Sequence, residues 1–347
     1  MKRVRLLIID DSITVRRLLT EIFGRDPEIE VIGAAPDPLV ARQMIKDLNP
    51  DVITLDVEMP NMNGLDFLEK IMRLRPMPVV MVSTLTKRGT EVTLDALALG
   101  AVDYFAKPAG NLASLLNDGA EGLCRKVKSA AAARVRPGPP KPAQTPAPQQ
   151  EFQKKLIAIG SSTGGVEALI DVIAHFPANC PPTLITQHMP AGFTTSFASR
   201  LDRISAAKVT EAVEGAPLSP GHIYLAPGAV SHLEVTGRGT WRCALVPDAP
   251  TSGHRPSVDR LFYSVARTVG ADAIGAILTG MGSDGAAGLR AMRDAGAATI
   301  GQDEGTSVVY GMPRVAFQQG AVQRQLPLEK IGPQILRIAS SEAKETA

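Results

Sequence analysis

The sequence has little net charge, few cysteines and no long hydrophobic run, and each shortage excludes a class of protein. Its 37 basic and 35 acidic residues leave a formal net charge of +2, so no overall charge attracts it to nucleic acid or anionic lipid. Its three cysteines are widely spaced, which excludes a disulfide framework and a thiolate zinc site. No segment approaches the ~20 apolar residues of a membrane span. We therefore expect a cytoplasmic protein with no nucleic-acid partner and no membrane insertion.

The length and one proline-rich segment predict how the chain is divided. At ~150 residues per domain, 347 residues correspond to two domains. Residues 137–148 contain six prolines and no large apolar side chain, a composition that favours extended polyproline II structure. We therefore predict a first domain at residues 1–128, a Pro-rich linker at 129–152 and a second domain at 153–347.

Before the linker, short β-branched runs alternate with helical patterns. Nearly continuous apolar strands between amphipathic helices are typical of a parallel sheet covered on both faces. Such sheets bind ligands at the carboxyl ends of their strands. The pattern predicts five strands and five helices, and the expected strands are Val4–Ile9, Val31–Ala34, Val52–Leu55, Val79–Val82 and Val102–Phe105.

The same alternation returns after the linker. A helix is expected at Val166–Ala174, and strands at Leu156–Ile159, Thr183–Thr186 and Ile274–Leu278. Three further short runs are separated by Gly turns and indicate an antiparallel hairpin region at one edge: Ile223–Ala226, Leu233–Thr236 and Trp241–Val246. The predicted fold class is therefore two doubly wound parallel α/β domains, the second with a small hairpin region.

Charged and hydroxyl side chains follow the expected strands of the first domain. Asp10 and Asp11 end the first strand, Asp56 the third, Ser83 the fourth and Lys107 the fifth. Crowded carboxylates with room for water suit Mg²⁺. With the metal bound, Asp56 could attack a phosphoryl group while Lys107 and Ser83 bind its oxygens. Helix capping and a surface lysine are the alternatives for single residues, but they explain the whole set poorly.

These segments resemble the receiver domain of two-component response regulators. The matching motifs are Ile9-Asp10-Asp11-Ser12, residues 55–60 with Gly64, and Lys107-Pro108. The resemblance covers about the first third of the chain and implies a flavodoxin-like fold with phosphorylation of Asp56 by a histidine kinase. It also implies Mg²⁺ binding by Asp10, Asp11, Asp56 and the Glu58 carbonyl, and switch roles for Ser83 and Tyr104.

A serine-containing loop opens the second domain. Residues 160–164, Gly-Ser-Ser-Thr-Gly, follow an expected strand and precede an expected helix, which is the context of a nucleophile elbow. The glycine register places Ser162 at the centre of the turn, and Ser161 is the alternative nucleophile. Phosphate binding is the rival function, but the segment lacks the P-loop lysine and the full G-x-G-x-x-G run.

A serine nucleophile needs a base and an orienting carboxylate. His188 follows the strand at Thr183–Thr186, and Asp284 lies in the Gly-rich loop after the strand ending at Leu278. Because these strand ends share a rim with Ser162, we expect a Ser-His-Asp triad, with a helix N-cap as the alternative role for Asp284. The other histidines are expected at a helix end (His175), at the surface (His222 and His232) and in a substrate loop (His254).

Four segments of this half resemble the chemotaxis protein-glutamate methylesterases, the CheB family: residues 160–165, 187–190, 254–259 and 279–286. With the receiver in front, the resemblance covers nearly the whole chain. It implies Ser162 as nucleophile, His188 as base and Asp284 as orienting residue, with Thr163 and Met281 near the oxyanion site.

This second resemblance also implies an activity and its partners. The substrates would be glutamate γ-methyl esters on methyl-accepting chemotaxis receptors, with release of methanol, and receptor glutamines would be deamidated by the same route. A chemotaxis histidine kinase would phosphorylate and activate the protein. Mg²⁺ would be needed for receiver phosphorylation, and no cofactor for the ester reaction.

Two other functions stay open from the residues alone. The second half could be a non-enzymatic response-regulator output that binds a partner, or a serine hydrolase of another ester or amide. A DNA-binding output is disfavoured because the second half shows no compact helix-turn-helix pattern and no basic stripe.

Overall fold

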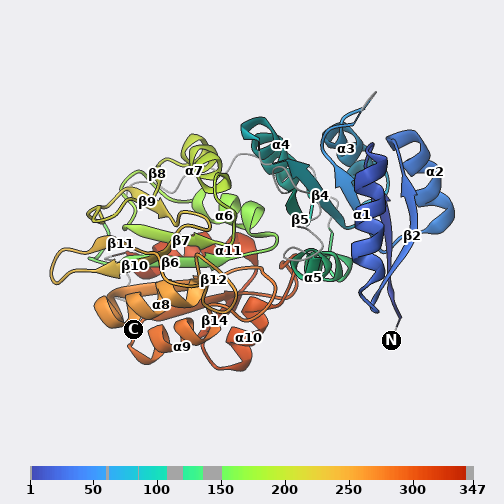
Figure 1. Ribbon diagram of the computed structural model, residues 1–347. Coiled ribbons are helices and arrows are strands. Elements are labelled where there is room, and N and C mark those ends of the chain that lie inside the picture. Colours follow the sequence, from blue (N-terminus) through green and yellow to red (C-terminus); the bar gives the residue numbers. More distant parts are fainter. Residues whose placement is uncertain (1, 60–61, 85, 108–119, 136–150, 341–347) are drawn as a thin grey trace. The chain divides into compact units, whose positions relative to one another are not determined.

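The chain folds into two compact units, Met1–Pro139 and Pro140–Ala347, shown in the computed structural model of Figure 1. The structure describes the whole chain except residues 1, 60–61, 85, 108–119, 136–150 and 341–347. Pro108 and most of the expected linker therefore lie outside the described residues. Within the expected linker 129–152, the last helix of the first unit continues to Ala131. Phe152, at the other end of the expected linker, forms a β-bridge with Ser340.

The first unit is a five-stranded parallel sheet in the order β2-β1-β3-β4-β5. The predicted doubly wound fold is confirmed, with α1 packed against α5 and α3 against α4. Its strands are β1 (Val4–Ile9), β2 (Ile29–Ala35), β3 (Val52–Asp56), β4 (Val79–Thr84) and β5 (Asp103–Lys107). Its helices are α1 (Ile13–Gly24), α2 (Pro38–Leu48), α3 (Gly64–Leu74), α4 (Lys87–Ala98) and α5 (Ala120–Ala131).

Short polar side chains set where the helices of this unit begin. Ser12 accepts a hydrogen bond from Val15 N–H at the start of α1, and Asp37 accepts two at the start of α2. Asn63 and Thr86 do the same for α3 and α4. Each of these side chains satisfies a backbone donor that has no partner within its helix. Ser12, within the first receiver motif, is thus the N-cap of α1.

The second unit is built on a seven-stranded sheet in the order β14-β13-β12-β6-β7-β9-β8, in which every neighbouring pair is parallel. Its strands are β6 (Leu156–Ser161), β7 (Thr183–Gln187), β8 (Lys208–Glu211), β9 (His222–Leu225), β12 (Ala273–Ile277), β13 (Ala298–Gln302) and β14 (Arg324–Leu326). The helices are α6 (Gly165–Ile173), α7 (Phe193–Ile204), α8 (Val258–Thr268), α9 (Ala286–Asp294), α10 (Met312–Gln318) and α11 (Leu328–Ala339), with a 3-10 turn at Gly270–Asp272.

The β-rich stretch divides differently from the expectation of a single hairpin region. Strands β10 (His232–Thr236) and β11 (Arg242–Val246) form the expected antiparallel pair. The first run of the stretch, β9, instead joins the main sheet between β7 and β8. It lies parallel to both, and its apolar side chains are buried there. A single apolar run pairs equally well with either kind of neighbour, so its sequence could not decide between them.

Helices cover both faces of the main sheet (Figure 1). Helix α6 packs against α7 and α11, while α8 packs against α9 and α9 against α10. The pair α8 and α9 approaches closely at Gly288, where an added Cβ would lie 2.7 Å from Phe262 Cβ and 2.9 Å from the Asp259 carbonyl oxygen. This contact fixes the start of α9 against the start of α8.

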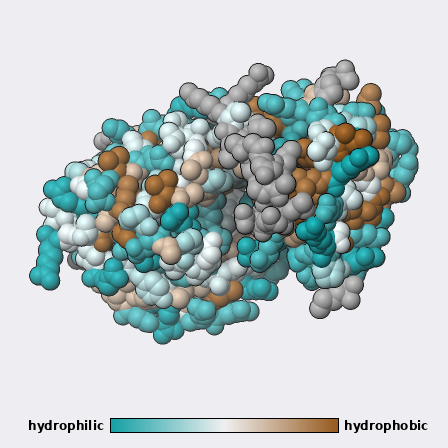
Figure 2. Space-filling view, viewed as in Figure 1, coloured by the Kyte–Doolittle hydropathy of each residue, from teal (hydrophilic) through white to brown (hydrophobic). Residues whose placement is uncertain are grey.

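The outer surface of the second unit is mixed in polarity. Figure 2 shows hydrophobic residues scattered among hydrophilic ones on its visible face. None of the helices in the described parts of the chain is long and apolar enough to cross a membrane.

The close approach of α8 and α9 predicts the effect of enlarging Gly288. We expect Gly288→Ala to lower the free energy of unfolding of the second unit by roughly 1–3 kcal/mol, because the new methyl group overlaps backbone and Phe262 Cβ. Trp241, the single tryptophan of the chain, lies in this unit and reports its unfolding by fluorescence in urea.

Gly305→Ala is the matched control, since the nearest atom to an added Cβ there is 3.6 Å away. Equal unfolding midpoints for the two variants would contradict the packing argument.

Candidate active site and phosphorylation site

Strand order brings three distant segments to one rim of the main sheet. In the order β12-β6-β7, residue Ile277 pairs with Gly160 and Ser161 with Gln187, so the three strands end level with one another. Ser162 follows β6 and His188 follows β7, while Asp284 lies in the loop between β12 and α9. The serine therefore has the histidine on one side and the carboxylate segment on the other.

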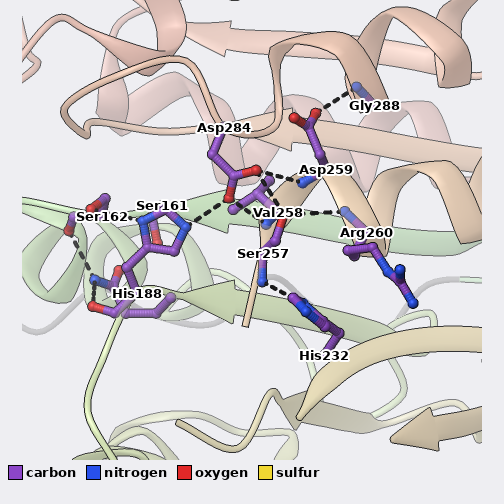
Figure 3. Close-up of polar contacts among 11 residues, drawn as sticks. Ser161, Ser162, His188, His232, Ser257, Val258, Asp259, Arg260, Asp284 and Gly288 are labelled. Atoms are coloured by element: carbon purple, nitrogen blue, oxygen red, sulfur yellow. Dashed lines mark hydrogen bonds and ion pairs between the residues drawn. The ribbon is translucent and has the colours of Figure 1, made fainter. Parts of the chain in front are cut away.

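The three side chains form one chain of hydrogen bonds (Figure 3). Ser162 Oγ lies 3.1 Å from His188 Nδ1, and His188 Nε2 lies 2.8 Å from Asp284 Oδ2. The structure thus brings together the serine, histidine and aspartate that the sequence singled out. His188 N–H also donates to the Ser161 carbonyl at 3.2 Å, which ties the residue after β7 to the end of β6.

The protonation of Asp284 decides the tautomer of His188. Burial raises the pKa of Asp284, but the hydrogen bond and charge interaction with His188 and the hydrogen bonds from Ser257 and Val258 outweigh it and lower the pKa to about 2. An ionised carboxylate only accepts hydrogen bonds, so His188 Nε2 carries the proton that it donates. In the neutral imidazole Nδ1 is then the acceptor, and it faces the Ser162 hydroxyl. This is the arrangement of a base aimed at a serine.

The N-terminus of α8 holds the Asp284 carboxylate. Asp284 accepts hydrogen bonds from the Ser257 hydroxyl at 2.7 Å, from Val258 N–H at 2.7 Å and from Asp259 N–H at 3.2 Å. Only 2% of Asp284 is exposed. A helix N-terminus presents free N–H donors and a positive dipole end, so an anion is stabilised here even though water is excluded. Asp284 itself does not cap α9, which begins after Gly285.

Ser257 links this carboxylate to a buried histidine. Ser257 N–H donates to His232 Nδ1 at 3.1 Å, and His232 Nε2 lies 3.0 Å from the Ala249 carbonyl oxygen, to which it donates. Both residues are fully buried. The expectation that His232 is a surface residue is therefore wrong: its two ring nitrogens pair with backbone groups, so it packs without leaving an unsatisfied polar atom.

The turn that carries Ser162 is less strained than the predicted elbow. The non-glycine residues with positive φ in the described chain are Asn49, Ala229 and Ser252, so the serine itself is relaxed. The left-handed conformation falls instead on Gly164, with φ 76°, just before α6. Gly165 N–H donates to the Ser162 carbonyl at 2.8 Å and closes the turn. Glycine adopts this conformation readily, so the turn forms without backbone strain at the reactive serine.

Ser161, the alternative nucleophile, points into the protein. It is fully buried, and its hydroxyl donates to Gln187 Oε1 at 2.6 Å. The amide of Gln187 donates in turn to the Ser162 carbonyl at 2.9 Å. This pair ties the turn after β6 to the end of β7. Ser162, by contrast, is half-buried and faces His188.

The two residues expected near an oxyanion lie on neighbouring loops. Thr163 follows Ser162, and its carbonyl accepts a hydrogen bond from the Thr279 hydroxyl at 3.0 Å. Met281 is half-buried in the loop after β12. That loop is held by Gly280, whose carbonyl accepts from Gly311 and Met312 N–H at 3.1 and 2.8 Å. Each loop is therefore held by hydrogen bonds to one of its carbonyl oxygens, that of Thr163 or that of Gly280.

The remaining histidines differ in their relation to the site. The His254 ring stacks on the His188 ring with 3.8 Å between centroids and 6° between planes. His222 is half-buried, stacks on Tyr224 and is bonded through Nε2 to Thr210 Oγ1. His175 follows the end of α6, as expected.

The acidic cluster of the first unit assembles around Lys107. Its ammonium group lies 2.9 Å from Asp10 Oδ2 and 3.0 Å from Asp56 Oδ1. One carboxylate oxygen each from Asp10, Asp11 and Asp56 lies within 4.8 Å of the others. Asp10 and Asp56 are buried, while Asp11 is exposed. The predicted convergence of these side chains at the carboxyl ends of β1, β3 and β5 is what the structure has.

Burial and charge act against each other in this cluster. Burial raises the pKa of Asp56 to about 6, and the Asp10 charge adds to the rise while Lys107 opposes it. Burial alone would lower the pKa of Lys107, but the carboxylates of Asp56 and Asp10 raise it instead. One lysine thus faces two buried carboxylates, and the site retains an excess of negative charge that suits a divalent cation.

The other residues expected in the receiver site lie on β4, on β5 and in the loop after β3. Ser83, at the end of β4, is buried, with its hydroxyl 3.4 Å from the Gly89 carbonyl oxygen. Tyr104 on β5 is buried, and Lys126 Nζ lies 5.4 Å from the centre of its ring. Burial and Asp103 raise the pKa of Tyr104 well above its usual value. Glu58 is exposed in the loop after β3.

Comparison with known proteins matches both halves of the chain. The family described as CheB methylesterase matches residues 157–335, and the response regulator receiver domain matches residues 6–117. The chain belongs to the CheB methylesterase family. A Caulobacter vibrioides protein named protein-glutamate methylesterase/protein-glutamine glutaminase 1 is 59% identical over 98% of this chain and 99% of its own length. A Rhizobium johnstonii protein of the same name is 58% identical over 99% and 98%.

A solved CheB structure supports the fold of the second unit. The CheB methylesterase catalytic domain of Thermotoga maritima has a TM-score of 0.52 and 37% identity, covering 54% of this chain and 99% of that domain. Membership of the CheB family thus agrees with the parallel sheet of the second unit.

Sequence reasoning missed the residues that hold the CheB site from behind. Gln187 and Ser257 lie within the motifs at residues 187–190 and 254–259, but the sequence indicated roles only for the histidines of these motifs. The signal for Ser257 was a serine directly before an amphipathic run with an acid two residues later, which is a helix N-terminal pattern. That its hydroxyl reaches Asp284 depends on where α8 packs, and no local pattern contains that information.

The Ser161–Gln187 pair predicts a difference between the two adjacent serines. We expect Ser161→Ala to lower the free energy of unfolding of the second unit by roughly 1–3 kcal/mol, because it leaves the buried Gln187 oxygen without its donor. Ser162→Ala should change it less, since that hydroxyl is half-buried. Urea unfolding followed by Trp241 fluorescence measures both, and a larger loss for Ser162→Ala would refute this account of the turn.

Proposed function

We propose that this protein is a phosphorylation-activated serine hydrolase that removes methyl groups from glutamate γ-methyl esters on chemotaxis receptors and deamidates receptor glutamines. The observation that carries the proposal is the hydrogen-bonded chain from Ser162 Oγ through His188 to Asp284. Its relatives named protein-glutamate methylesterase/protein-glutamine glutaminase support the substrate class. The proposed catalytic residues are Ser162, His188 and Asp284.

In the first step His188 Nδ1 takes the proton of Ser162 as the serine oxygen attacks the ester carbonyl carbon. The histidine becomes positively charged, and Asp284, ionised and buried beside Nε2, stabilises that charge. Backbone N–H groups near Thr163 and Met281 would stabilise the negative charge on the carbonyl oxygen.

In the second step the tetrahedral intermediate collapses and the bond to the methoxy oxygen breaks. His188 returns its proton to that oxygen, so methanol leaves and an acyl-serine remains. Water then attacks the acyl carbon with His188 again as base, which yields the free carboxylate and restores Ser162. A glutamine side chain would follow the same route with ammonia in place of methanol.

The receiver unit would control this chemistry through Asp56. The oxygen donors of Asp10, Asp11 and Asp56 fit Mg²⁺, which prefers such ligands, and the Glu58 carbonyl is the fourth proposed ligand. The bound ion would offset the negative charge of the carboxylates and of the incoming phosphoryl group. Lys107 and Ser83 would bind phosphoryl oxygens, and Tyr104 would respond to them as a switch residue. A chemotaxis histidine kinase would be the phosphodonor.

Two observations disfavour the alternative of a non-enzymatic output domain. A structural serine at a strand end has no need of a histidine whose tautomer is fixed by a buried carboxylate, yet Ser162 has one. The identity to proteins with a methylesterase name also extends over nearly the whole chain.

The proposed chemistry predicts the loss of methanol release from three variants. Ser162→Ala and His188→Gln should abolish nearly all release from methylated receptor membranes, because each removes a participant in bond making. Asp284→Asn should reduce the rate by up to ~10⁴-fold by analogy with another Ser-His-Asp triad. Ser199→Ala, at an exposed serine of α7, is the matched control and should keep its methanol release. Normal release by Ser162→Ala would exclude the serine mechanism.

Control by the receiver predicts how a phosphodonor changes the rate of methanol release. Acetyl phosphate with Mg²⁺ should raise methanol release by the wild-type protein and leave Asp56→Asn at its basal rate, since the acceptor oxygen is lost. Chelation of Mg²⁺ should likewise abolish the stimulation. Asp37→Asn, in a carboxylate that caps α2, is the control and should respond like wild type. Equal stimulation of Asp56→Asn would rule out this phosphorylation site.

A further inference from the structure

A second buried carboxylate lies behind the proposed triad. Asp259 is in the first turn of α8 and is 7% exposed. Its backbone N–H donates to Asp284 Oδ1 at 3.2 Å, and its own Oδ1 accepts from Gly288 N–H at 2.7 Å. Figure 3 shows both contacts, with Asp259 between the Asp284 loop and the start of α9. The mechanism described above does not use this side chain.

Asp259 takes the place of the missing cap of α9. That helix begins after Gly285, which has no side chain to accept a hydrogen bond. Gly288 N–H bonds to the Asp259 carboxylate instead, so a donor in the first turn of α9 is satisfied by a residue of α8. Because Asp284 directly precedes this turn, the cap also fixes where the triad carboxylate lies relative to His188.

The charge of Asp259 also acts on the Asp284 carboxylate. Burial raises the pKa of Asp259 to about 6, the backbone donors lower it, and the negative charge of Asp284 raises it further. In the described residues, Asp284 is the ionisable group that acts on Asp259, and Asp259 acts in turn on Tyr263, one turn along α8. Tyr263 has a pKa raised by burial and by Asp259. Asp259 is therefore a group whose charge can change close to pH 6, next to the proposed orienting carboxylate.

We propose that Asp259 is a positioning residue whose ionised form supports the Ser162–His188–Asp284 chain and whose neutral form weakens it. Ionised Asp259 places a second negative charge behind Asp284, which favours the positive charge that His188 acquires when it takes the serine proton. Neutral Asp259 lacks this charge, and its O–H can donate to the Asp284 carboxylate and compete with His188 for it. The inference rests on the proposed function.

The test measures the reactivity of Ser162 without a receptor substrate. The full-length protein, without phosphodonor, is labelled with a fluorophosphonate, and the second-order rate constant is followed between pH 5 and 8.5. Asp259→Asn represents the neutral form at every pH. Asp202→Asn is the matched control. Asp202 lies on α7, away from the proposed triad, and its carboxylate likewise accepts a backbone hydrogen bond, from Val209 N–H at 2.7 Å.

We expect Asp259→Asn to be labelled roughly 10-fold more slowly than wild type at pH 8, the size of effect typical when a supporting partner behind a functional ligand is lost. The ratio should approach one at pH 5, because wild-type Asp259 is then protonated as well. The transition should lie near pH 6. Asp202→Asn should follow wild type throughout.

Thermal stability separates this role from a purely structural one. The raised pKa means that the folded protein binds the Asp259 proton more tightly than the unfolded chain does, so ionisation costs stability as the pH rises from about 4 through 6. At pH 8 that cost is complete, and Asp259→Asn removes it. The variant should therefore melt no lower than wild type at pH 8, although it reacts more slowly.

Three results would overturn the inference. A wild-type to Asp259→Asn ratio that stays constant from pH 5 to 8.5 would exclude a role for the charge. A lower melting temperature together with equal labelling would mean that Asp259 only caps α9. If the wild-type protein were no more labelled than Ser162→Ala, the proposed function itself would fail, and this inference would fail with it.

Discussion

The burial of one ionised carboxylate determines the arrangement of the catalytic unit. Asp284 is almost completely excluded from water, and an isolated carboxylate in such a place would be neutral rather than charged. The free N–H groups of α8 and the Ser257 hydroxyl compensate for the lost water. The position of α8, the close contact of α8 with α9 and the burial of His232 all serve to keep these donors in place.

The parallel sheet supplies the other half of the geometry. In a parallel sheet every carboxyl end lies at one edge, so segments separated by more than a hundred residues meet without a long connection. Here β6 is between β12 and β7, and the serine after β6 consequently has its base on one neighbouring strand. The tautomer of His188 then follows from the charge of Asp284 and not from any property of the histidine.

The receiver unit also buries carboxylates, but different groups compensate for their charge. Asp10 and Asp56 are buried close together, but a lysine rather than a helix N-terminus faces them. Burial, together with the charge of Asp10, keeps the pKa of Asp56 above its usual value although Lys107 opposes the rise. In the catalytic unit, protein groups alone stabilise the Asp284 carboxylate. In the receiver, a metal ion would stabilise the Asp56 carboxylate further and would let it accept a charged phosphoryl group.

The sequence by itself determined the two parallel α/β units and the residues at their strand ends, because apolar periodicity and strand-to-loop position are local properties. It indicated Ser162, His188 and Asp284 without their contacts. Only the tertiary structure decided that β9 joins the main sheet, that His232 is buried, and that Ser257 and Asp259 support Asp284. These outcomes depend on which elements pack together, and that pairing is selected by the burial of the whole core.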